Sequence, residues 1–193
     1  MRQKAMPGRV VLALTGLWLA AAVAVGASGV LRSLRPPAPQ MVLVALTVLT
    51  IVSLATVGVL RRWAAGVDLR VLVSVHLARF VGFYFLYLWR RGELPYDFAV
   101  PGGIGDVIVA AGAMGVLLVR DETVRRRAVL AWNVVGLADI LFVVATAVRL
   151  ALLDPESMSA LLRLPLCLLP TFLVPIIIAT HVLVFVRLSA ASR

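Results

Sequence analysis

Long runs of apolar residues dominate the chain, and short clusters of charged residues separate them. A helix needs about 20 residues to cross a hydrocarbon core about 30 Å thick, and six runs are near or above this length. A segment that crosses lipid alone can satisfy its backbone only as an α-helix. The pattern therefore predicts an all-α membrane protein, a bundle of six transmembrane helices. The predicted spans are residues 10–31, 41–60, 70–89, 103–119, 128–152 and 164–187.

Composition supports this prediction. Hydrophobic residues make up 62% of the chain and charged residues only 15%, whereas soluble domains are about half apolar. No hydrophilic stretch is long enough for a soluble domain, so we expect residues 1–193 to form a single transmembrane domain. The single cysteine, Cys167, excludes an internal disulfide.

The first apolar run follows a basic N-terminal segment, as in a secretory signal peptide. Its apolar part covers about 20 residues, whereas the apolar region of a signal peptide covers about 7–15. We therefore expect residues 10–31 to remain as a helix, and cleavage of this segment is the alternative.

The net charge of +10 has its ordinary explanation in membrane topology rather than in nucleic-acid binding, because basic loops stay in the cytoplasm. Alternate loops and the two termini carry 12 Lys and Arg residues on one side, against 5 on the other. The sequence thus predicts a multi-pass protein of the bacterial inner membrane, embedded in the lipid bilayer, with both termini cytoplasmic. The residues on the basic side are Arg2, Lys4, Arg9, Arg61, Arg62, Arg70, Arg120, Arg125, Arg126, Arg127, Arg187 and Arg193.

Few polar side chains fall inside the predicted spans, and each is costly in lipid and therefore a functional candidate. Arg79 on the third span and Asp139 on the fifth lie within about one helical turn of the same depth. An unpaired charge at that depth would be expensive, so we expect an Arg79–Asp139 ion pair. The candidate polar residues are His76, Arg79, Asp106, Asn133, Asp139 and His181.

The two histidines lie at one predicted depth. His76 is six residues from Arg70, and His181 is six residues from Arg187. Asn133 lies at a similar distance from the inner end of the fifth span. Two histidines at one level can ligate a haem b iron or contribute to a metal site. The alternative is that each histidine forms a hydrogen bond to a neighbouring helix.

The segment PGGIGD, residues 101–106, places three glycines and a carboxylate at the start of the fourth run. It lacks the GxxxxGK pattern and the preceding strand of nucleotide-binding loops. Asp106 in a first helical turn would meet unpaired N–H groups and the positive end of the helix dipole. We therefore expect Asp106 either to cap this helix or to line a cavity open to the outside.

Three stretches, FAVPGGIGD, AWNVVGLAD and LPTFLVPIIIATH, resemble motifs of an uncharacterised family of small bacterial polytopic membrane proteins. The resemblance covers roughly residues 76–187. It implies that Asp106, Asn133 and His181 stand at the polar positions typical of the family, and it implies no activity.

Three functions fit these features. The first is binding of haem b or a metal through His76 and His181. The second is transport along a polar path formed by Asp106, Asp139, Arg79 and His181. An enzymatic activity is a fourth and weaker option, because no catalytic motif is readable.

The third function is that of an accessory subunit or a homo-oligomer within a larger membrane complex. Pairs of small residues let helices approach closely in lipid. The candidate docking faces contain Gly26 with Gly29 and Gly112 with Gly115.

Overall fold

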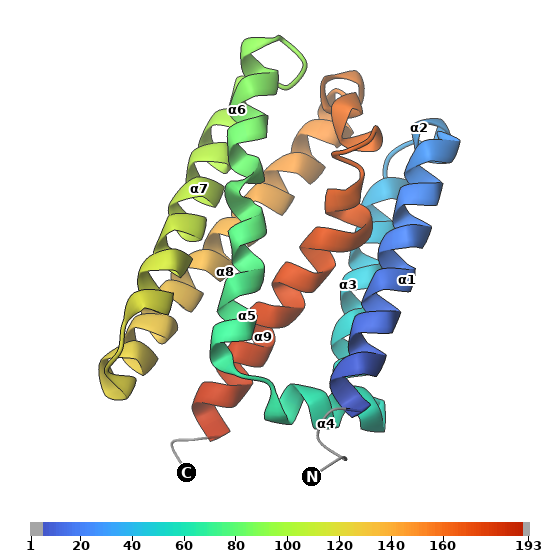
Figure 1. Ribbon diagram of the computed structural model, residues 1–193. Coiled ribbons are helices and arrows are strands. Elements are labelled where there is room, and N and C mark those ends of the chain that lie inside the picture. The colour runs from blue at the N-terminus through green and yellow to red at the C-terminus, as the bar shows by residue number, and fades with distance from the viewer. Residues whose placement is uncertain (1–5, 191–193) are drawn as a thin grey trace. The chain divides into compact units, whose positions relative to one another are not determined.

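The computed structural model describes residues 6–190, and within this range it contains helices and turns but no β-strand (Figure 1). Residues 6–190 contain nine α-helical segments, two 3₁₀ segments and one π segment. The elements are, in chain order, α1 (Met6–Ser28), α2 (Val30–Ser33), α3 (Ala38–Thr56), α4 (Gly58–Gly66), α5 (Leu69–Ser74), η2 (Val75–Val81), α6 (Gly82–Arg90), α7 (Tyr96–Leu118), α8 (Glu122–Leu153), η3 (Glu156–Leu162), η4 (Leu169–Leu173) and α9 (Val174–Ala190).

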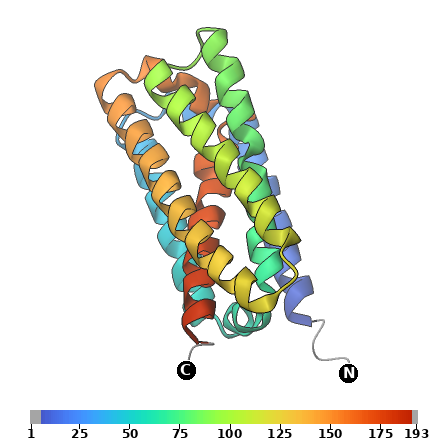
Figure 2. The same cartoon turned by 90° about the vertical axis from the view of Figure 1, so that its left-hand side faces the viewer.

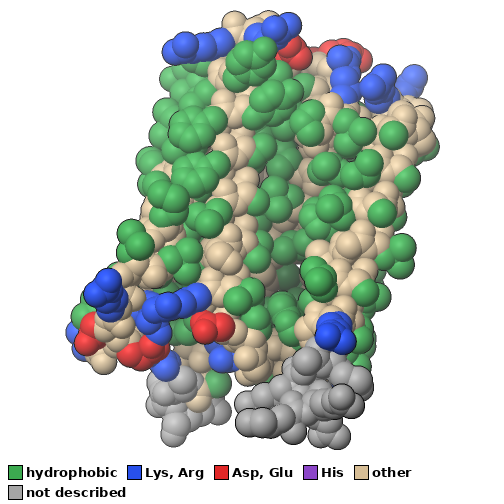
Figure 3. All heavy atoms as spheres, in the orientation of Figure 1, with side chains coloured by type: hydrophobic (Ala, Val, Ile, Leu, Met, Phe, Trp, Pro, Cys, Tyr) green, Lys and Arg blue, Asp and Glu red, His purple; other side chains and the backbone are tan. Residues whose placement is uncertain are grey.

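Six helical stretches in residues 6–190 are long and apolar enough to cross a membrane, which agrees with the six predicted runs. On the face drawn in Figure 3, hydrophobic side chains cover the middle of the helices, and charged side chains gather near their ends. This distribution is typical of an integral membrane protein. The stretches are Gly8–Ser28, Ala38–Thr56, Leu69–Arg90, Tyr96–Leu118, Glu122–Leu153 and Leu169–Ala190.

The chain divides into two compact units, and the first comprises residues 1–67 and 161–179. Helix α4 contacts both α1 and α3 in this unit. The Trp18 indole N–H donates to the carbonyl oxygen of Thr171 at 2.9 Å, and its ring packs edge-on against Phe172. These contacts fasten α1 to the segment that precedes α9.

The second unit comprises residues 68–160 and 180–193 and contains all six candidate polar residues. Helices α7 and α8 run side by side along their length (Figure 2). The buried residues of α8 recur at helical spacing, so one stripe of this helix faces its neighbours. This stripe contains Val129, Trp132, Asn133, Gly136, Ile140, Val143 and Thr146.

The start of the fourth helix differs from the prediction. Helix α7 begins at Tyr96, seven residues before the predicted start, and Pro101 lies inside it. Asp97, not Asp106, is the acidic residue of the first turn. The expectation that Asp106 caps this helix is therefore wrong. The sequence obscured this because a proline and three glycines ordinarily mark a loop.

The third and sixth spans also depart from regular α-helix. Residues 75–81 form the 3₁₀ segment η2 inside the third span. In the sixth span, the predicted run from residue 164 becomes helical only at η4, a π segment with Pro170 near its start. Such irregular turns inside helices are often found at functional sites, and η2 carries two of the candidate polar residues.

Candidate functional site: a buried charged cluster and a histidine pair

Segment η2 places His76 and Arg79 on one face of the third span. Residues three apart in a 3₁₀ helix lie directly above one another, so the two side chains point the same way. Both are fully buried within the described part of the chain. A buried arginine must find partners for its N–H groups.

Two glycines bring η2 and α6 against α7. A Cβ atom on Gly82 would meet the carbonyl oxygen of Gly103 and would lie 2.9 Å from the Cβ atom of Asp106. A Cβ atom on Gly103 would lie 2.7 Å from the carbonyl oxygen of Gly82. The absence of both side chains lets the backbones touch, and this contact sets Asp106 beside Arg79.

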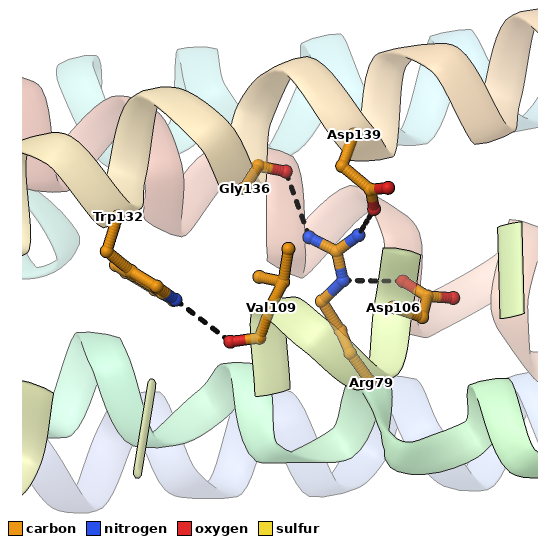
Figure 4. Close-up of polar contacts among 6 residues, drawn as sticks. All are labelled: Arg79, Asp106, Val109, Trp132, Gly136 and Asp139. Carbon is orange, nitrogen blue, oxygen red and sulfur yellow. Dashed lines mark hydrogen bonds and ion pairs between the residues drawn. The ribbon is translucent and has the colours of Figure 1, made fainter. Parts of the chain in front are cut away.

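The Arg79 guanidinium uses all its nitrogens within the second unit (Figure 4). Its Nε donates to Asp106 Oδ1 at 2.6 Å, and its Nη2 donates to Asp139 Oδ2. Its Nη1 donates to the carbonyl oxygen of Gly136 at 2.9 Å. The structure thus pairs Arg79 with Asp139, the partner expected from the sequence, and adds Asp106 as a second partner. We call these three side chains the charged cluster.

The two carboxylates of the charged cluster differ in exposure. The Asp106 side chain is 5% exposed and the Asp139 side chain 16%, while that of Arg79 is 1% exposed. Gly105 makes room for Asp139, because a Cβ atom there would collide with Asp139 Oδ1. Asp139 is therefore the more exposed carboxylate of the charged cluster.

Both polar atoms of the Asn133 side-chain amide, on α8, contact His181. The Asn133 Nδ2 donates to the backbone carbonyl oxygen of His181 at 3.1 Å, and Asn133 Oδ1 lies 2.8 Å from His181 Nδ1. Because an amide oxygen only accepts, Nδ1 must carry the hydrogen. In a neutral ring, the Nε2 of His181 then has a free lone pair.

The two histidines touch each other, a contact that their equal predicted depth allows but does not require. Their ring centroids are 4.2 Å apart, and His76 Nε2 lies 3.1 Å from Thr180 Oγ1. His76 Nδ1 and His181 Nε2 have no hydrogen-bond partner among the described residues. The pair therefore offers two buried nitrogen atoms without a hydrogen bond.

This arrangement does not fit a haem held between the two histidines. An iron atom bound by two imidazoles at about 2 Å from each nitrogen keeps the ring centroids about 6 Å apart. The observed separation of 4.2 Å leaves no room for a porphyrin. Within residues 6–190, no group of three or more His, Cys, Asp or Glu residues is placed to hold a metal ion.

Trp132 lies beside the histidines instead of at a membrane surface. Trp132 is four residues from the start of the predicted fifth span, residues 128–152, and tryptophan is common at such membrane interfaces. The structure buries it, and its Nε1 donates to the carbonyl oxygen of Val109 at 2.9 Å (Figure 4). Its ring meets His76 edge-on, with the centroids 4.9 Å apart. The packing of Trp132 against the histidines was not predicted from the sequence. The only signal in the sequence was that Trp132 directly precedes Asn133.

The glycines proposed as docking faces behave differently from one another. A Cβ atom on Gly26 would lie 2.6 Å from Cys167 Sγ, and one on Gly112 would lie 3.0 Å from the Trp132 ring. These two glycines therefore serve contacts inside the chain. Gly29 and Gly115 have open space around the Cβ position.

Comparisons with known proteins give a family but no activity. No curated protein and no solved structure matches the chain. One family model, described as a domain of unknown function (DUF8737), matches residues 36–189. This range covers most of the chain and includes every member of the charged cluster and the histidine pair. The chain therefore belongs to the DUF8737 family.

Proposed function

We propose that the charged cluster binds and releases a proton, and that the protein belongs to the class of proton-coupled membrane transporters. The observation that carries the proposal is the charge balance. One guanidinium faces two carboxylates, all within helical stretches that are long and apolar enough to cross a membrane. With both carboxylates ionised, the charged cluster has a net charge of −1.

A net charge inside a membrane-spanning bundle is expensive, because little water is present to solvate it. One proton on either carboxyl group makes the charged cluster neutral. The proton can then exchange at Asp139, whose side chain is the more exposed of the two. Proton relays in pumps and transporters are built from such intramembrane Asp and His side chains.

The proposal includes the location of the protein. We infer a multi-pass protein of the bacterial inner membrane with both termini in the cytoplasm, folded as one transmembrane domain over residues 1–193. The excess of Lys and Arg in alternate loops supports this orientation. Three of the counted residues, Arg2, Lys4 and Arg193, lie outside the described residues.

Infrared spectroscopy of the protein in lipid vesicles tests the proton. At about pH 7 the exposed carboxylates are ionised, so a carbonyl band of a protonated carboxyl group should come from the charged cluster. We expect this band in the wild type and its loss in D139N and in D106N, because either substitution removes the charge imbalance.

The matched control is D97N, which changes an exposed aspartate on the same helix as Asp106. This variant should keep the band. If the wild type has no such band, or if D97N removes it as D139N does, the charged cluster does not hold a proton and the proposal fails.

Cysteine labelling from one side of the membrane tests the orientation. Cys167 is first replaced by Ser, since it is the only cysteine. A membrane-impermeant maleimide added outside intact cells should then label E93C, in the turn between α6 and α7, but not D121C, at the start of α8. External labelling of D121C would reverse the inferred topology.

A further inference from the structure

His181 is a buried base beside the charged cluster. It is fully buried, and its Nε2 has no hydrogen-bond partner among residues 6–190. Asn133 fixes the ring with the hydrogen on Nδ1, so the free atom is an acceptor rather than a donor. A buried acceptor without a partner has a free-energy cost. Binding of a proton to this atom would remove that cost.

One residue, Gly136, connects this base to the charged cluster. Its carbonyl oxygen accepts from Arg79 Nη1 at 2.9 Å. On its other side, the Cε1 and Nε2 atoms of His181 lie 2.7 Å and 3.3 Å from the position a Cβ atom would take. His181 therefore contacts the same backbone unit that the Arg79 guanidinium binds.

We propose that His181 Nε2 is a second proton-binding atom, which exchanges a proton with the carboxyl group of Asp139; this inference rests on the proposed function. In the step, the O–H bond of the Asp139 carboxyl group breaks and an N–H bond forms on Nε2. The products are a carboxylate and an imidazolium.

The unchanged total charge of the interacting groups favours this step. Before the transfer, Arg79 and Asp106 form a pair of opposite charges while Asp139 and His181 are neutral. After it, two positive groups, Arg79 and His181, face two carboxylates. The total charge is zero in both states, so the proton moves without leaving a net charge in the lipid-embedded bundle.

The other titratable and charged groups around His181 are few. His76 and Arg79 face it from η2, and Asp106 and Asp139 belong to α7 and α8. Arg79 and an imidazolium would repel each other, and the two carboxylates oppose this repulsion. Removal of one carboxylate should therefore make the imidazolium much less favourable.

Solid-state NMR of the protein in vesicles, with ¹⁵N in the histidine rings, tests the inference. Only two histidines are present, so H76Q assigns the signals. In the wild type we expect singly protonated His181, with the hydrogen on Nδ1, at alkaline pH and a doubly protonated ring as the pH falls. At a fixed acidic pH, D139N should lower the ratio of doubly to singly protonated His181 by about tenfold or more.

D97N serves as the control and should leave this ratio unchanged. If D139N does not fold, D106N removes the same charge from the other side of Arg79 and gives the same readout. The inference is overturned if His181 stays singly protonated at every pH at which the fold persists, or if D139N and D106N match D97N. In that case the infrared carboxyl band would still decide the proposed function independently.

Asn133 is the positioning residue of this step. N133L removes the acceptor that fixes the hydrogen on Nδ1, so the NMR spectrum at alkaline pH should show both tautomers of His181. A single Nδ1–H tautomer in N133L would show that Asn133 does not orient the ring.

Discussion

Replacement of Arg79 by Leu should destabilise the protein more than any other single substitution in the charged cluster. The change leaves the buried Asp106 and the part-buried Asp139 without a cation and leaves the Gly136 carbonyl oxygen without its donor. Breaking a buried ion pair costs about 3–5 kcal/mol, and R79L breaks the buried pair with Asp106 and the part-buried pair with Asp139. Thermal unfolding in detergent micelles should show a greatly lowered midpoint or a loss of folded protein.

Two further variants make this result specific. The triple variant R79L/D106N/D139N should recover much of the loss, because it leaves no uncompensated charge. R91L breaks the exposed pair between Arg91 and Glu93, whose side chains are 58% and 45% exposed, and should change the unfolding midpoint little, because solvent screens such a pair. If the triple variant is no more stable than R79L, the lost packing of the long side chain, rather than its charge, explains the effect.

Replacement of Gly82 by Ala should also destabilise the protein strongly, although alanine has the higher helix propensity. Alanine is favoured over glycine in a helix interior by about 1 kcal/mol, so propensity alone predicts a gain. At Gly82, however, the added Cβ atom would meet the backbone of Gly103 and the Cβ atom of Asp106. Because the obstacle is backbone, the helices must separate, and we expect a net loss near the upper end of the about 1–3 kcal/mol that overpacking usually costs.

G115A is the matched control for G82A. Gly115 lies in α7, and nothing is within 4 Å of its Cβ position, so this variant should be neutral or slightly stabilising. The comparison uses the same unfolding assay. Equal stability of G82A and G115A would mean that the close contact between α6 and α7 is not needed for the fold.

The Gly105→Ala variant tests whether proton binding depends on the position of the Asp139 carboxylate. A methyl group there would collide with Asp139 Oδ1 and push the carboxylate away from Arg79. We expect G105A to weaken the ion pair and to change the infrared carboxyl band of the charged cluster. A wild-type band in G105A would show that Asp139 adopts another position without consequence for the proton.

The sequence by itself determined the helical class and the six stretches long and apolar enough to cross a membrane, and it predicted the depth of the polar residues. Hydropathy is decisive here because a span must be long, apolar and helical to satisfy its backbone in lipid. Depth follows from the fixed rise of a helix, about 1.5 Å per residue. These two constraints were enough to predict contact between Arg79 and Asp139 and a common level for His76 and His181.

Only the tertiary structure decided which faces of the helices meet. Lipid is as apolar as a helix interface, so both faces of a span are apolar and periodicity does not distinguish them. The place of Asp106 could not be read because glycines and a proline resembled a loop, whereas they lie within α7 and allow contact with Gly82. The same close packing at Gly136 joins His181 to the group that Arg79 binds, because only a residue without a side chain fits between them.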